Sequence, residues 1–169
     1  SGRYWINVLQ DNQPGTAHGL LILLHGSSAS NYREFVDDMA QVATTNRLIP
    51  VSVLAPNGGG WNEGDQTQNA RTLNAFIQDE LLPKYNIDKR RIFFSGQSSG
   101  GGVLSSHFIA LHGANYQGGA FCLCGTQPPQ RFTATEAMKT GFKVHFEITT
   151  GDGIWTSSFQ PSVQAYQNA

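Results

Sequence analysis

Short apolar runs alternate along this chain with segments that repeat their apolar positions at a helical spacing. The runs are short enough to be strands, and they lie at Tyr4–Leu9, Gly19–Leu24, Pro50–Leu54, Arg91–Ser95, Gly118–Cys124 and Phe142–Thr149. The run Gly19–Leu24 contains no polar position after its glycine, which is typical of a strand covered on both faces.

Apolar positions spaced by about 3.6 residues predict helices between these strands. In the first helix, over residues 32–43, Asn31 offers an N-cap with Glu34 three residues later, as in a capping box. The second helix runs from Ala70 to Leu81 and is expected to stop before Pro83. The others are Ser99–His112, with Gly113 as a C-terminal stop, a weak helix at Thr135–Thr140, and a last one beginning at Ser162–Gln167.

The order β-β-α-β-α-β-α-β-α-β-α predicts the α/β class, with a mostly parallel sheet and helices on both of its faces. No repeat or long linker divides the chain, so residues 1–169 are expected to form one domain. Functional groups in such sheets lie beyond the carboxyl ends of the strands. Gly26-Ser27, Ser98 and Asp152 fall at such ends.

Ser98 is the strongest candidate for a catalytic residue. It stands in Gly96-Gln97-Ser98-Ser99-Gly100, between the strand Arg91–Ser95 and a predicted helix. The pentapeptide is common by chance, but strand, G-x-S-x-G and helix together form the nucleophile-elbow arrangement. A sharp turn of this kind holds a serine hydroxyl exposed, and the flanking glycines let the two chain segments pass closely.

The loop after the Leu/Ile strand, His25-Gly26-Ser27, is placed to supply one N–H of an oxyanion hole. The best candidates for the two donors are the backbone N–H groups of Ser27 and Ser99. His25 is expected to brace this loop rather than to act as a base. Trp61-Asn62, also at the end of a strand, either walls a substrate cleft or packs in a loop.

Asp152 is the expected acid of a catalytic triad, because it follows a strand end and satisfies the chain order Ser…Asp…His that accompanies the elbow. The alternative is an aspartate that shapes a turn. The histidine is the difficulty, since none follows Asp152 in the sequence. Each of the other four is poorly positioned in the sequence, namely His18, His107, His112 and His145.

Composition limits the partners. The chain has 11 Lys and Arg against 12 Asp and Glu and no basic block, so a nucleic-acid partner is not expected. No apolar run approaches the ~18 residues of a membrane span. The charged fraction of 14% and the many Gln, Asn and Thr residues favour a secreted or periplasmic protein.

The two cysteines, Cys122 and Cys124, alternate along an expected strand and should therefore share one face. They are interpreted as two small buried apolar residues. A strained disulfide and a metal site are the alternatives, although no further ligand spacing accompanies them.

With these motifs in place, the chain resembles the α/β-hydrolase superfamily, and more narrowly the polyhydroxybutyrate-depolymerase and feruloyl-esterase-like carboxylesterases. The segments that carry the resemblance are Tyr4–Val8, Leu23–Ser27, Ala55–Gly58, and Tyr85–Ile92 leading into Gly96–Gly101. It implies Ser98 as nucleophile, Asp152 as acid and oxyanion donors at Ser27 and Ser99. It implies no metal and no organic cofactor.

Members of that family continue with another strand and a histidine loop, so the C-terminal part is expected to be missing from this sequence. Self-association through an open sheet edge and uncovered apolar surface is then expected. The predicted function is that of a serine carboxylesterase acting through an acyl-enzyme at Ser98. The alternative is a non-catalytic hydrolase-like binding or interaction domain. Feruloyl, acetyl-sugar, short acyl and polyester substrates all remain open.

Overall fold

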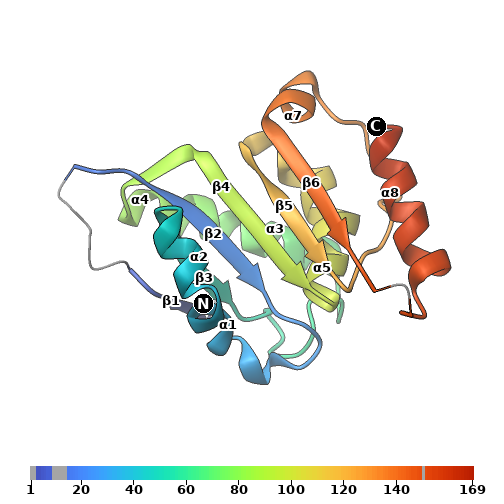
Figure 1. Ribbon diagram of the computed structural model, residues 1–169, viewed down its shortest axis with the longest axis horizontal. Helices are drawn as coiled ribbons and strands as arrows, with labels where there is room; N and C mark the ends of the chain where they lie inside the picture. The colour runs from blue at the N-terminus through green and yellow to red at the C-terminus, as the bar shows by residue number, and fades with distance from the viewer. Residues whose placement is uncertain (1–2, 9–14, 150) are drawn as a thin grey trace.

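The computed structural model describes residues 3–8, 15–149 and 151–169. A six-stranded sheet forms its centre, in the order β1-β3-β2-β4-β5-β6 (Figure 1). The strands are β1 (Tyr4–Ile6), β2 (His18–Leu24), β3 (Leu48–Val53), β4 (Ile87–Gln97), β5 (Gly118–Leu123) and β6 (Phe142–Glu147). Only β1 runs antiparallel to its neighbour, which confirms the prediction of a mostly parallel α/β sheet.

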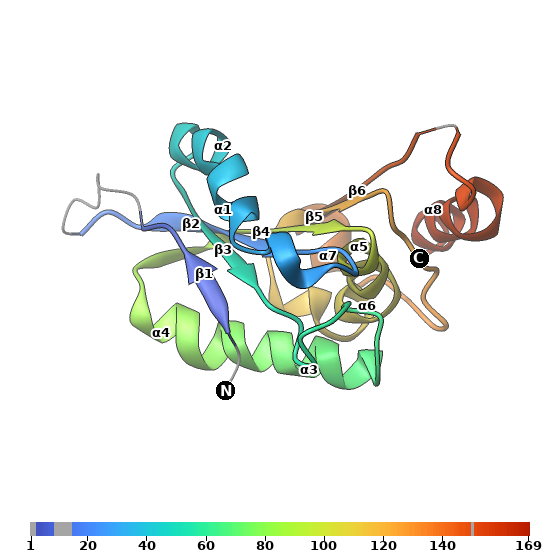
Figure 2. The ribbon, with the colours of Figure 1, turned by 90° about the horizontal axis from the view of Figure 1, so that it is seen from below.

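Helices cover both faces of the sheet, as the alternation predicts. The α-helices are α1 (Glu34–Asp38), α2 (Ala40–Thr45), α3 (Gln66–Phe76), α4 (Leu82–Lys84), α5 (Ser99–Val103), α6 (Ile109–His112), α7 (Glu136–Gly141) and α8 (Gln160–Gln167). Shorter 3₁₀ and π turns are η1 (Ala29–Asn31), η2 (Ile77–Leu81), η3 (Leu104–Phe108), η4 (Gly113–Asn115) and η5 (Trp155–Phe159). Figure 2 shows α1 and α2 on one face and α3, α4 and α6 on the other.

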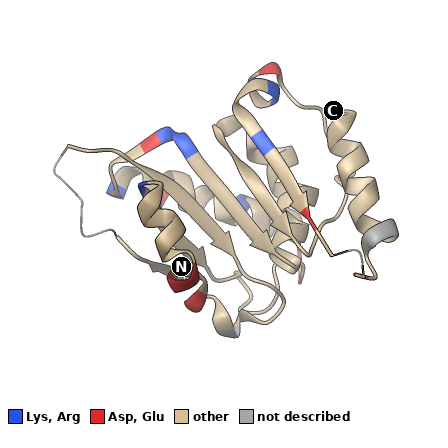
Figure 3. Cartoon of the chain, in the orientation of Figure 1, with Lys and Arg blue, Asp and Glu red and all other residues tan. Residues whose placement is uncertain are grey.

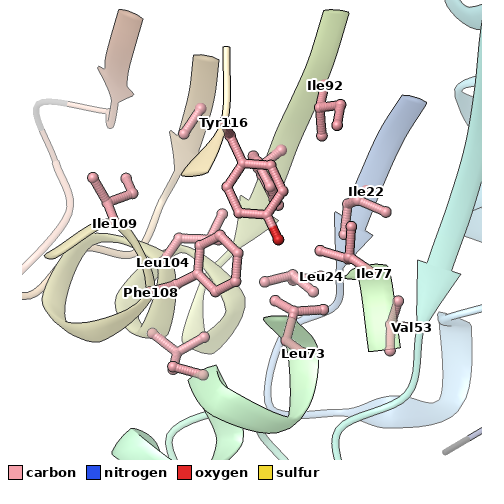
Figure 4. Packing of buried hydrophobic residues seen from close by; sticks show 14 of the residues in the cluster. Ile22, Leu24, Val53, Leu73, Ile77, Ile92, Leu104, Phe108, Ile109 and Tyr116 are labelled. Atoms are coloured by element: carbon pink, nitrogen blue, oxygen red, sulfur yellow. The ribbon is translucent and has the colours of Figure 1, made fainter. Parts of the chain in front are cut away.

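The two faces carry cores of different size. On the α3 and α5 side, side chains of β2, β3 and β4 pack against both helices and against Phe108 and Tyr116, as Figure 4 shows. On the α1 and α2 side, the buried cluster is small and consists of Leu21, Leu23, Val36, Ala43 and Leu48. The larger core includes the start of the helix after β4, so it holds the elbow segment in place.

Part of the sheet on the α2 side is uncovered. A hollow of about 520 Å³ lies there between α2 and β6, over Phe93 and Phe121. Val42 on α2 borders it and is 47% exposed. Self-association through this end of the sheet stays a prediction.

The first predicted helix differs from its prediction. Asn31 does not cap it, because Asn31 ends the 3₁₀ turn η1 and α1 begins only at Glu34. The single helix expected over residues 32–43 is divided at Met39, where the backbone leaves the helical region at φ −93° and ψ 1°. The capping-box prediction was therefore wrong, since the chain makes an extra turn before it enters the helix.

The expected bounds of the second helix are also wrong. The second helix continues past Pro83, because the π turn η2 precedes it and a wider turn reduces the clash of the proline ring with the preceding carbonyl groups. This helix also begins earlier, at Gln66, where the Asp65 side chain accepts the N–H of Gln68. The helix after β4 ends at His112 with Gly113 as its C-cap, as expected, and a 3₁₀ turn follows from Gly113 with φ −55°.

The ends of three strands differ from their predictions by one to four residues. β4 is longer than expected and begins at Ile87, whereas β5 ends at Leu123 and β6 ends at Glu147. Cys124 therefore lies outside the strand, in the left-handed region at φ 49°, so the prediction that both cysteines share one strand face was wrong. Both cysteines are free thiols. The predicted end of the first strand, Leu9, lies outside the described residues.

Candidate active site

Ser98 forms a sharp turn between the end of β4 and the start of α5. Its backbone has φ 51° and ψ −116°, a conformation that costs a residue with a side chain about 1–3 kcal/mol. Two backbone hydrogen bonds hold it there: its N–H donates to the Leu123 carbonyl at 2.9 Å, and its carbonyl accepts from Gly102 at 2.9 Å. The side chain is exposed, as a nucleophile requires.

Two glycines allow this turn to form by letting backbone segments touch. A methyl group on Gly96 would stand 2.5 Å from the carbonyl carbon of Gly100. A methyl group on Gly100 would stand 2.4 Å from the carbonyl oxygen of Leu24 on β2. Neither contact leaves room for a side chain, so the G-x-S-x-G pattern reflects close packing of β4, α5 and β2.

The loop after β2 lies against the elbow. A methyl group on Gly26 would be 3.4 Å from Cβ and 3.9 Å from Oγ of Ser98. Ser27 follows in this loop and is exposed. The loop is thus close enough to Ser98 for its N–H groups to reach a reacting carbonyl.

His25 braces this loop with both of its ring nitrogens. The ring is fully buried, Nε2 accepts the N–H of Ala55 at 3.0 Å, and Nδ1 lies 2.6 Å from the Gly26 carbonyl oxygen. Because Nε2 is the acceptor, we assign the proton to Nδ1, which donates to Gly26. Burial lowers the pKa of His25, so the ring stays neutral and is held in a structural role.

Ser99, the second predicted oxyanion donor, is the first residue of α5. The first N–H groups of a helix have no acceptor within the helix, so the N–H of Ser99 is available to a ligand. Its hydroxyl accepts the N–H of Trp61 at 3.2 Å. Trp61 is 1% exposed, which settles its two readings in favour of a packed loop residue.

A cavity of about 400 Å³ brings most of the predicted site together. Ser27, Ser98, Ser99 and Asp152 all line it. The structure therefore brings together four residues that lie up to 125 positions apart in the sequence. Their roles as donors, nucleophile and acid remain predictions.

Asp152 lies in the loop between β6 and α8 and is half-buried. Its Oδ1 accepts the N–H of Ile154 at 3.1 Å, and its own N–H donates to Thr149 at 3.0 Å. The first of these bonds is the Asx-turn contact of a turn-forming aspartate. One carboxylate oxygen of Asp152 thus shapes the loop.

No histidine lines this cavity in the part of the chain that the structure describes. His145 projects from β6 with a side chain that is 66% exposed; it lies 3.8 Å from Glu147 and stacks on Phe121. His107 contacts Ser106 at 2.6 Å on the elbow helix. Of the remaining two, His18 begins β2 and His112 ends α6.

Sequence reasoning missed one wall of the cavity. Cys124, Thr126 and Gln127 follow the carboxyl end of β5 and line the cavity beside Ser98. The same rule that selected the ends of β2, β4 and β6 could have found them, but the cysteines had been assigned to a buried strand. Ser158 from η5 donates a hydrogen bond to the carbonyl of Thr126 and joins this wall to the Asp152 loop.

Lysine and arginine side chains lie mainly away from this end of the sheet (Figure 3). Figure 3 shows Lys and Arg mainly at the opposite end, around the amino-terminal ends of the strands. Asp152 is the one charged residue in the cavity lining that the structure describes. The described part of the chain holds no group of three or more His, Cys, Asp or Glu suited to a metal ion.

In the described ranges, no helix has the length and apolar character needed to cross a membrane.

Several solved structures with the same fold are named as esterases. The carboxylesterase of Bacillus cereus superposes with a TM-score of 0.75 at 22% identity, covering 99% of this chain and 80% of its own. A carboxylesterase from Mesorhizobium loti gives 0.62 at 18% identity, over 90% of this chain and 74% of its own. The acetyl xylan esterase of Aspergillus awamori gives 0.56 at 19% identity, over 69% and 44%.

These similarities establish the α/β-hydrolase fold for this chain. No protein-family model matches the sequence, and no curated protein matches it. The fold therefore rests on the structure, and the activity has to be argued from the site.

Proposed function

We propose that this protein is a serine ester hydrolase with Ser98 as its nucleophile. The observation that carries the proposal is the strained turn at Ser98, which presents an exposed hydroxyl to the same cavity as Ser27, Ser99 and Asp152. Strain in a well-packed structure is typical of functional positions. The esterases that share the fold support the same reading.

In this proposal, Ser98 Oγ attacks the carbonyl carbon of an ester and loses its proton to a base. The oxyanion of the tetrahedral intermediate is bound by the N–H groups of Ser27 and Ser99, each worth roughly 3 kcal/mol in such sites. The intermediate collapses, and the alcohol leaves with the proton. Water then attacks the acyl-enzyme, which releases the acid and restores Ser98.

The expected base is a histidine held by Asp152, although none of the five histidines of this sequence lines the described cavity. Asp152 would fix its tautomer and stabilise its charged form. Free imidazole is a small substitute for such a side chain. It therefore offers a way to ask whether the serine side of the site works when a base is supplied.

Hydrolysis of p-nitrophenyl acetate tests the proposal directly. The protein is compared with Ser98→Ala and with Ser95→Ala, a control on the same strand and outside the cavity. We expect Ser98→Ala to lose the activity that exceeds the uncatalysed rate and Ser95→Ala to retain it. Imidazole hydrolyses this ester by itself, so its effect is measured as the rate above that of the same imidazole solution without protein. This excess rate should rise for the protein but not for Ser98→Ala. Equal rates for all three proteins would overturn the proposal.

A non-catalytic binding domain is the second candidate. The observation that favours it is the absence of a histidine from the described cavity lining. A fluorophosphonate probe separates the two functions, because it reacts only with an activated serine. Labelling that is lost in Ser98→Ala favours the enzyme, whereas no labelling with or without imidazole favours the binding domain.

A further inference from the structure

The cavity beside Ser98 is unusually polar for a small-molecule site. Ile154 is the only aliphatic side chain among its described lining residues, and no aromatic ring is present. Ligand sites are commonly lined mainly by apolar and aromatic side chains with few polar groups. A long acyl chain or an aromatic acid would therefore find little apolar surface here.

Gln127 is held over the elbow helix by its backbone. Its N–H donates to the buried Ser105 hydroxyl at 2.9 Å, and its carbonyl oxygen lies 3.0 Å from the same hydroxyl. The preceding residue, Thr126, is tied to η5 by Ser158. The position of Gln127 beside Ser98 is therefore fixed from two sides, although its side chain is only half-buried.

The side chain of Gln127 lies on the surface of α5. Its Cγ and Cδ atoms would be 3.9 and 3.8 Å from a methyl group on Gly102, one turn after Ser98. The hydrogen bonds found in the described structure involve the backbone of Gln127 and leave its carboxamide to solvent and ligand. A second carboxamide, that of Asn62, lines the cavity near Ser27.

We propose that the Gln127 carboxamide binds a free hydroxyl on the alcohol part of the substrate, which makes the preferred substrates small-acyl esters of polyhydroxy alcohols. This inference rests on the proposed ester hydrolysis at Ser98. A carboxamide both donates and accepts, as a hydroxyl does, so the two groups are complementary. An anionic alcohol is disfavoured, since Asp152 is the one charge among the described lining residues.

Two esters with the same acyl group test this inference. 1-Acetylglycerol and propyl acetate both release a three-carbon primary alcohol, but only the first carries free hydroxyls. We expect a higher kcat/KM for 1-acetylglycerol. In Gln127→Met, which keeps the length of the side chain and removes its polar atoms, the ratio of the two values should fall roughly fivefold to tenfold, as for loss of one hydrogen bond.

Gln130→Met is the matched control, because Gln130 is exposed and does not line the cavity. It should leave the ratio unchanged. Taking the ratio within each variant cancels the amount of active protein, and comparing the ratios between variants cancels the difference in leaving-group chemistry. If Gln127→Met and Gln130→Met gave the same ratio of kcat/KM values, the role proposed for Gln127 would be wrong, whereas the proposed ester hydrolysis would still hold. If the unchanged protein hydrolysed neither of the two esters, the proposed function would be wrong as well.

Discussion

The serine side and the acid side of the candidate site are built in different ways. Ser98 stands at the centre of the sheet, where Gly96 and Gly100 bring three backbone segments into contact. Asp152 follows the edge strand β6, and methyl groups on its neighbours Gly151 and Gly153 would meet nothing within 4 Å. The same cavity is thus bounded by a tightly packed wall and by a loosely packed loop.

This difference shows what close packing contributes to a site of this kind. The serine side is preorganised, because its strained turn is compensated by contacts with the larger core. The acid side depends on two local hydrogen bonds around Asp152 and on the Ser158 contact. We therefore expect changes on the serine side to affect stability strongly and changes on the acid side to be tolerated.

The largest expected difference in stability is between a glycine-to-alanine substitution on the serine side and one on the acid side. Gly100→Ala would set its Cβ 2.4 Å from the Leu24 carbonyl oxygen and 2.8 Å from that of His25, both backbone atoms. We expect it to lower the free energy of unfolding by at least about 4 kcal/mol. Gly151→Ala should change it by less than about 0.5 kcal/mol. Urea titration measures both, and similar losses in the two variants would contradict the comparison.

A smaller effect is expected from pH. Burial lowers the pKa of His25 in the folded protein. As the pH falls below the ordinary histidine pKa of about 6.5, the unfolded chain therefore binds a proton at this residue before the folded protein does. Stability should therefore fall between pH 7 and 5, with a slope of up to about 1.4 kcal/mol per pH unit for each such group. His25→Ala should be less stable at pH 7, since the N–H of Ala55 loses its acceptor, and its slope should be shallower.

The slope will not vanish in that variant, because burial also lowers the pKa values of His107 and His112. His145→Ala is the control from the acid side, where the side chain is 66% exposed. Thermal unfolding at several pH values gives the slopes. A His25→Ala slope as steep as that of the unchanged protein would refute the structural role of His25.

The smallest effect concerns the two thiols. Burial raises the pKa of Cys122 to about 12, whereas Cys124 lies half-buried at the cavity. Since the thiolate is the reactive form, one thiol of the native protein should react readily with a disulfide reagent at pH 8. Cys124→Ala should remove this reaction and Cys122→Ala should retain it. Equal reactivity in both variants would contradict the burial of Cys122.

Local patterns were sufficient for the order of the elements and for the serine half of the site. The elbow was predictable because strand, turn and helix are consecutive, so Ser98 and Ser99 follow from a short stretch of sequence. The helix end at Pro83 was mispredicted, since the π turn before it overrides local propensity. Cys124 was mispredicted because nothing in the sequence marks where β5 ends.

The sequence by itself determined the α/β class, the elbow at Ser98 and the candidate status of Asp152, because these depend on patterns between neighbouring residues. Only the tertiary structure decided that the ring of His25 is bound to Ala55, 30 residues away. Only the structure, likewise, brought Gln127 to the cavity and left the five histidines away from it. Such outcomes depend on which strands become neighbours and on how closely their loops pack, and no local pattern encodes them.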